Sequence, residues 1–176
     1  MMPPTLRKVA LTLHVTTSVG WLGAVAAFLA LAVTGLTADG DATARGAYVA
    51  ADVITWAVIV PLALASLVTG VVQSVATPWG LLRHYWVVVK LVLTLVATGL
   101  LLLHTQPIGH LGAVAAAGEP LTADLDGMRG QLLFDAVAAL VVLLGATVLA
   151  VVKPRGVTRF GRRARAEAVI SNARHG

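Results

Sequence analysis

Positive charge is sorted to one side of four apolar stretches, and this sorting constrains the fold more than any other feature of the sequence. The stretches run roughly over residues 9–37, 53–76, 86–103 and 136–152. If successive connections lie on alternate faces of a membrane, eleven of the thirteen Lys and Arg residues and only one of the eight acids fall on one face. Positive residues resist translocation, so that face is expected to be cytoplasmic, with both termini inside. The eleven are Arg7, Lys8, Arg83, Lys90, Lys153, Arg155, Arg159, Arg162, Arg163, Arg165 and Arg174.

The composition is typical of an integral membrane protein. Hydrophobic residues make up 58% of the sequence and charged residues only 12%. A helix needs about 20 apolar residues to cross a hydrocarbon core of ~30 Å, and lipid forces each span to satisfy its own backbone. We predict an all-α, integral membrane four-helix bundle with spans at about residues 6–37, 47–76, 80–105 and 129–152. These form one domain, 1–153, followed by a basic cytoplasmic tail, 154–176.

Two prolines and the missing cysteines refine this prediction. Pro61 lies inside the second span and should kink it or free a carbonyl. Pro107 opens the long connection Thr105–Arg129, which is expected to be a loop or to hold a short interfacial helix. The chain has no cysteine, which excludes disulfides, thiolate ligation of haem and a Cys-based copper site. The basic tail should dock on membrane lipids and not on nucleic acid, and the Gly- and Ala-rich helix faces suggest a homodimer.

Polar residues inside a span need an explanation, because a charge at the bilayer centre costs about 2.5–3.5 kcal/mol. One group is expected near the cytoplasmic side: His14 on the first span, and Arg83, His84 and Lys90 on the third. Counting from the basic flanks puts His14 and Lys90 at similar depth. His84 is about 120° from Lys90 around the helix, so these two should not converge. Trp21 lies on the same face of the first span as His14 and is expected to belong to the same cofactor-binding site.

Four of these residues, His14, Lys90, Arg83 and His84, each have a role in binding haem as one interpretation and a different role as the alternative. His14 is either an axial ligand of b-type haem or a packed histidine bonded to a carbonyl or hydroxyl. Lys90 either ligates iron, transfers a proton or pairs with a haem propionate, or it snorkels to the headgroups. Arg83 holds a propionate or a lipid phosphate. His84 is a second axial ligand or an interfacial histidine.

A second polar group is expected near the outer side. It consists of Asp52, His104, Gln131 and Asp135. With His110, His104 flanks a Pro-Gly segment, and the group could form a second haem site, a quinone pocket or a metal site. Copper(I) prefers the soft ligands Met and Cys, of which only Met128 is near. The two carboxylates are expected to pair with Arg45 and Arg129.

Short motifs add a resemblance. Leu13-His14 followed by Trp21 and Gly23 resembles the "LH-x6-W-x-G" opening of small bacterial membrane families, among them the CopD-like copper-resistance domain and the HemJ-type protoporphyrinogen oxidase. Trp86 through Lys90 to His104 is similar to the "W-x-x-x-K-L … H" helix of the HemJ type, and the whole chain looks closest to an uncharacterised four-helix family of the same group. The resemblance implies haem b, a functional pair formed by His14 and Lys90, and the bacterial cytoplasmic membrane.

The sequence therefore predicts a membrane protein that binds b-type haem and acts in electron transfer or haem-linked redox chemistry, as a possible membrane oxidoreductase. Its partner would be a quinone or a redox protein. Two alternatives stay open: a haem-free subunit that transports copper or a small solute, and a purely structural membrane subunit.

Overall fold

The computed structural model describes residues 3–76, 84–152, 156 and 158, and the described elements are helices. Four helical segments are long and apolar enough to cross a membrane: Pro4–Thr37, Asp41–Val75, Tyr85–Ala116 and Ala123–Val152. The all-α class and the set of four candidate spans are as predicted. Arg83, the break at residues 77–80 and most of the basic tail lie outside the described residues.

The first two segments form an antiparallel pair. Helix α1 runs over Pro4–Thr37 and begins with proline in its first turn, where a missing N–H costs nothing. Helix α2 (Asp41–Ile54) begins after the short turn at Ala38–Gly40, and the Gly40 carbonyl accepts hydrogen bonds from the N–H groups of Thr43 and Ala44. The polar turn thus reverses the chain within three residues.

The second segment changes its winding where proline was expected to disturb it. A π-helical turn, η1 (Thr55–Ile59), joins α2 to α3 (Val60–Ala76), and the N–H of Val60 donates to the carbonyl of Thr55. Pro61 follows at once and has no N–H to continue the α-helical ladder. A wider turn absorbs this defect, and the helix continues through it.

The third segment is longer than expected. Helix α4 runs over Tyr85–Ala116 with Pro107 inside it. Residues 105–116 therefore continue the third segment, where a loop or a separate interfacial helix was expected, and that prediction was wrong. The reason is an apolar face that continues past the proline, with Ile108, Leu111 and Ala115 buried. The helix ends in a Schellman-type cap, where Gly118 takes a φ of 73° and the N–H of Glu119 donates to the carbonyl of Val114. A 3-10 turn, η2 (Ala123–Leu125), then leads into α5 (Asp126–Val152).

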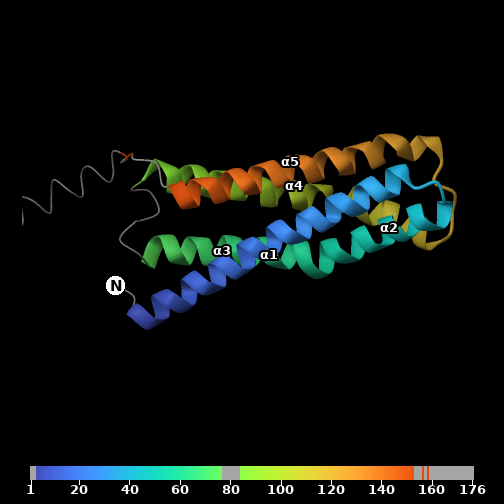
Figure 1. Ribbon diagram of the computed structural model, residues 1–176. Coiled ribbons are helices and arrows are strands. Elements are labelled where there is room, and N and C mark those ends of the chain that lie inside the picture. The colour runs from blue at the N-terminus through green and yellow to red at the C-terminus, as the bar shows by residue number, and fades with distance from the viewer. Residues whose placement is uncertain (1–2, 77–83, 153–155, 157, 159–176) are drawn as a thin grey trace, which may run out of the picture.

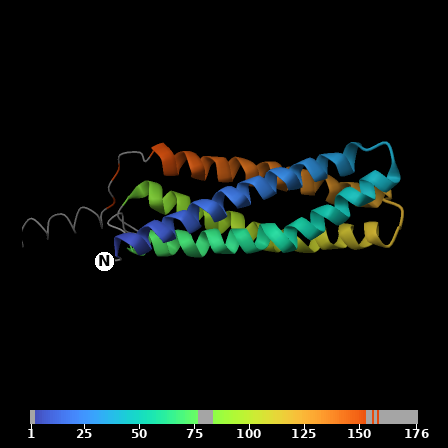
Figure 2. The same cartoon turned by 60° about the horizontal axis from the view of Figure 1, so that its bottom comes forward.

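The helices form one elongated bundle (Figure 1). Helix α1 crosses it obliquely and packs against α2, α3 and α5, and α4 packs against the same three (Figures 1 and 2). Helices α1 and α4 are therefore diagonal across the bundle. A side chain of α1 that meets one of α4 must do so in the bundle interior.

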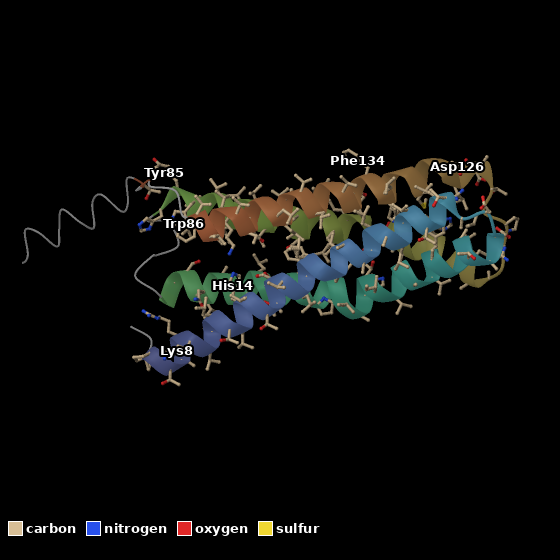
Figure 3. The ribbon with its side chains drawn as sticks, viewed as in Figure 1. Lys8, His14, Tyr85, Trp86, Asp126 and Phe134 are labelled. Atoms are coloured by element: carbon tan, nitrogen blue, oxygen red, sulfur yellow. The ribbon has the colours of Figure 1, made fainter. Side chains whose placement is uncertain are left out.

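The two ends of the bundle differ in charge and packing. We call the end with Arg7 and Lys8 the basic end, and the end with Asp41 and Asp126 the acidic end (Figure 3). The apolar core fills the acidic half, and the first buried residue of α1 is Trp21. The core residues are Trp21, Ala24, Val25, Phe28, Ala32, Tyr48, Ala51, Ile59, Ala63, Ile108, Leu111, Ala115, Leu125, Leu132, Ala136 and Leu143. The interior of the basic half holds polar side chains beside buried apolar ones such as Val87 and Ala146.

Candidate functional site

His14 and Lys90 meet in the interior of the basic half. The Lys90 Nζ lies 3.1 Å from the His14 Nε2, although the two residues are on diagonal helices. His14 lies in the half of the bundle that also holds Lys8, Tyr85 and Trp86 (Figure 3). The contact places both residues in one site at one depth along the bundle.

A threonine of α3 fixes the orientation of the imidazole. The His14 Nδ1 lies 3.1 Å from the Thr69 Oγ1. The Thr69 hydroxyl donates its own hydrogen to the carbonyl of Ala65 at 2.6 Å, so toward His14 it must accept. His14 therefore carries its proton on Nδ1 and an unprotonated lone pair on Nε2. This is the tautomer in which Nε2 can ligate a metal, and the Nδ1–H bond is of the kind that orients ligating histidines.

Small and hydroxylated residues surround the pair. Ser18 and Ser66 join α1 to α3 through hydroxyls 2.8 Å apart. A Cβ at Gly70 would lie 3.0 Å from the His14 Cε1, so the glycine leaves the ring its place. In α3 these residues lie at positions 66, 69 and 70, on one face of the helix. Sequence reasoning missed Ser66 and Thr69, although this spacing within an apolar stretch could have indicated them.

Two polar atoms near this interior have no hydrogen-bond partner among the described residues. They are the Gln73 Oε1 and the Thr98 Oγ1, both buried. Thr98 is only 4% exposed. Buried polar groups are normally satisfied, by protein or by ordered water. The interior of the basic half is thus suited to a polar or hydrated occupant, unlike the apolar core beyond Trp21.

The other expected site residues lie apart from this pair. Trp21 is 3% exposed and belongs to the core, two turns beyond His14. His84 precedes the first turn of α4, and its ring centroid lies 6.4 Å from that of Trp86. His84 is six positions from Lys90, or about 9 Å along the helix axis. Arg83, as noted, lies outside the described residues.

The outer group is arranged differently from the prediction. His104 and His110 do not flank a turn, because α4 is continuous through both. The His104 Nδ1 lies 3.7 Å from the Asp135 Oδ2 of α5. Asp52 packs against α4 instead, where a Cβ at Gly112 would lie 2.7 Å from the Asp52 Cβ.

The expected pairing of these carboxylates with the arginines was also wrong. Arg45 pairs with Asp41, four positions earlier on the same helix. Arg129 pairs with Asp126 at 2.8 Å, and its Nε donates to the Tyr48 hydroxyl at 2.9 Å. Each arginine is thus satisfied by a carboxylate three or four positions away, a spacing that brings side chains together on a helix.

Arg129 also ties three helices together at the acidic end. Besides Tyr48 of α2, it donates from Nη2 to the carbonyl of Gly35 in the last turn of α1, at 2.8 Å. The carbonyls in a last helical turn lack partners within the helix, so this bond satisfies one of them. We regard Arg129 as a structural residue.

Fold and site together define an all-helical bundle with four helices able to cross a membrane and a His–Lys pair inside it. Comparison of the chain with protein-family models, with curated proteins and with solved structures finds no match. Within the described residues, no three His, Cys, Asp or Glu side chains are grouped so that they could hold a metal ion. A haem needs only one or two protein ligands, so this does not bear on haem.

Proposed function

We propose that the protein binds b-type haem in the cytoplasmic half of the membrane and serves in electron transfer or haem-linked redox chemistry. The observation that carries the proposal is the set of hydrogen-bond partners around His14, from which its tautomer follows. Thr69 holds the proton on Nδ1 and leaves the Nε2 lone pair directed into the bundle interior. An axial histidine ligand of haem iron needs this arrangement.

The surroundings of His14 fit the group. A second nitrogen donor, the Lys90 amine, is 3.1 Å from Nε2 on another helix. The first half of α1 has no fully buried side chain, so it packs less closely against its neighbours than the segment beyond Trp21 does. The Lys90 amine would have to leave Nε2 free for iron, and its flexible four-carbon stem would permit this.

The residues divide the work as follows. His14 would hold the iron, Thr69 would orient His14, and Lys90 would either be a second ligand of the iron or pair with a propionate. When bound, haem supplies one-electron redox chemistry. The resemblance of the motifs around His14 and Lys90 to the HemJ type supports the same pair.

The proposal also specifies how the chain is oriented across the membrane and which membrane holds it. Both termini lie in the cytoplasm, because the sequence puts eleven of thirteen basic residues on that side. The motif resemblance is to bacterial families, which favours the bacterial cytoplasmic membrane. Anionic lipids contact the basic face, and a second copy of the chain contacts a lipid-exposed helix face.

An absorbance experiment tests the haem proposal. Protein is purified in detergent from haem-replete cells, and reduced-minus-oxidised spectra are recorded for wild type, His14→Ala and His110→Ala. His110 is exposed on α4 and serves as the matched control. We expect a b-type signal in wild type and in His110→Ala, and its loss in His14→Ala.

The variant Lys90→Met separates the two roles of lysine. If the amine is a ligand, the absorption bands shift; if it holds a propionate, the bands stay in place and haem is lost more easily. A colourless wild type would refute the proposal, and copper or solute transport without haem would become the better account. A wild-type signal retained in full by His14→Ala would refute the assignment of the ligand.

A further inference from the structure

A histidine–carboxylate pair lies toward the acidic end of the bundle and is separate from the proposed haem site. It consists of His104 on α4 and Asp135 on α5, with the His104 Nδ1 3.7 Å from the Asp135 Oδ2. Their side chains are 27% and 30% exposed. His104 is fourteen positions beyond Lys90, about 21 Å along the helix axis. The pair is thus near the opposite boundary of the membrane from His14.

The hydrogen bonds of the pair fix what it can offer a ligand. The His104 Nδ1 lies 2.9 Å from the carbonyl of Leu100, to which it must donate, because a carbonyl only accepts. His104 therefore has an unprotonated lone pair on Nε2. The Asp135 Oδ2 is buried without a hydrogen-bond partner among the described residues. If Nε2 accepts a proton, Asp135 is placed to balance the new charge, as in other His–carboxylate pairs.

The surface around the pair is apolar. Leu103 precedes His104 and is 72% exposed, and Phe134 precedes Asp135 and is 71% exposed. Figure 3 shows Phe134 on the outside of α5. In a membrane-spanning bundle such side chains face lipid. A ligand of this pair therefore arrives through the bilayer, donates a hydrogen bond, and carries an apolar body.

We infer that His104 and Asp135 form a binding site for the head group of a quinol, with the His104 Nε2 accepting a hydrogen bond from a quinol hydroxyl. A lipid phosphate does not fit, because a carboxylate repels it and both groups of the pair are acceptors. Among the described residues, a metal ion would find only two ligands here. A quinol offers a neutral O–H donor on a lipid-soluble molecule, as the pair requires.

The inferred binding of quinol does not depend on the proposed haem function, but the use of quinol as an electron donor rests on that proposed function. Oxidation to the quinone breaks two O–H bonds and releases two protons and two electrons. One proton passes to the His104 Nε2 and the other to water at the outer surface. The two electrons would pass singly to the one-electron acceptor of the proposed redox protein. The site thus assigns a substrate class to the proposed redox protein.

Equilibrium dialysis of detergent-purified protein against ubiquinol-1 tests the inference. We expect saturable binding to wild type, weakened about tenfold in His104→Leu, the loss expected of one hydrogen bond in an apolar site. Asp135→Asn keeps the shape and loses the charge, and should weaken binding less. His110→Leu, six positions along the same helix, should bind like wild type.

The outcomes separate this inference from the haem proposal. His14→Ala should lose haem and still bind quinol, and a colourless wild type that binds quinol through His104 would refute the haem proposal alone. Equal binding by wild type and His104→Leu, with both folded by size-exclusion chromatography, would overturn the inference. So would saturable retention of an ethanolamine lipid that depends on His104 while ubiquinol-1 is not bound.

Discussion

Gly35 at the acidic end should be the most sensitive glycine of the bundle. A Cβ built there would lie 2.5 Å from the Cζ of Tyr48 and 2.9 Å from both Cε atoms. The Tyr48 ring cannot move aside, because it is 1% exposed and its hydroxyl is bonded to Arg129. Gly35→Ala must therefore displace a helix or break the Arg129 contacts.

The size of the effect follows from three contributions. Overpacking costs about 1–3 kcal/mol. Complete loss of the hydrogen bond between Tyr48 and the charged Arg129 would cost about 1.5–3 kcal/mol more. Alanine regains about 1 kcal/mol of helix propensity. We expect a net loss of about 2–3 kcal/mol in the free energy of unfolding, which lowers Tm by about 4–12 °C for a chain of this length.

Thermal unfolding in detergent, followed by circular dichroism, measures this change. Gly46→Ala on α2 is the matched control, because a Cβ at Gly46 meets nothing within 4 Å. It gains the same helix propensity without a clash and should keep or raise Tm. If both variants have the Tm of wild type, the described packing of Tyr48 against Gly35 is incorrect.

Three further predictions concern other parts of the bundle. Gly112→Ala should lower Tm, because its Cβ would lie 2.7 Å from the Asp52 Cβ, whereas Gly109→Ala, 3.7 Å from the Asp52 Oδ1, should be tolerated; equal Tm values would contradict the contact. Thr69→Val should lower haem affinity about 10–100-fold, as loss of a bond to a ligating histidine does. Ser74→Ala should leave the affinity unchanged, because the Ser74 hydroxyl donates to the Gly70 carbonyl. A haem titration of both variants measures the difference. Since the chain has no cysteine, an impermeant maleimide should label Ala42→Cys in whole cells and Thr5→Cys only after permeabilisation, and the reverse pattern would refute the orientation.

The four helical segments long and apolar enough to cross a membrane could be predicted from the sequence, because apolar length is a strong local signal. Pro61 also acts where it was expected to, since proline always removes a backbone donor. Pro107 misled the prediction for a reason of packing. Ile108, Leu111 and Ala115 are buried beyond the proline, and this burial keeps α4 helical where the local rule predicts a loop.

The candidate site, like the fold, could be predicted only in part. Residue counting placed His14 and Lys90 at one depth, and their contact at 3.1 Å agrees with that count. The role of Thr69 could not be predicted, because it depends on how α3 is rotated against α1. The partners of Arg45 and Arg129 were mispredicted because near neighbours on the same helix were overlooked in favour of distant carboxylates at a similar depth.

The diagonal position of α1 and α4 has a consequence for biosynthesis. Membrane segments leave the ribosome in order, so α1, α2 and α3 can associate before α4 exists. At that stage both His14 and its partner Thr69 have been made, but Lys90 has not. The nascent protein therefore passes through a stage in which the lone pair of His14 has no Lys90 beside it. Insertion of α4 completes the site, and the order of translation thereby sets the order in which its parts are assembled.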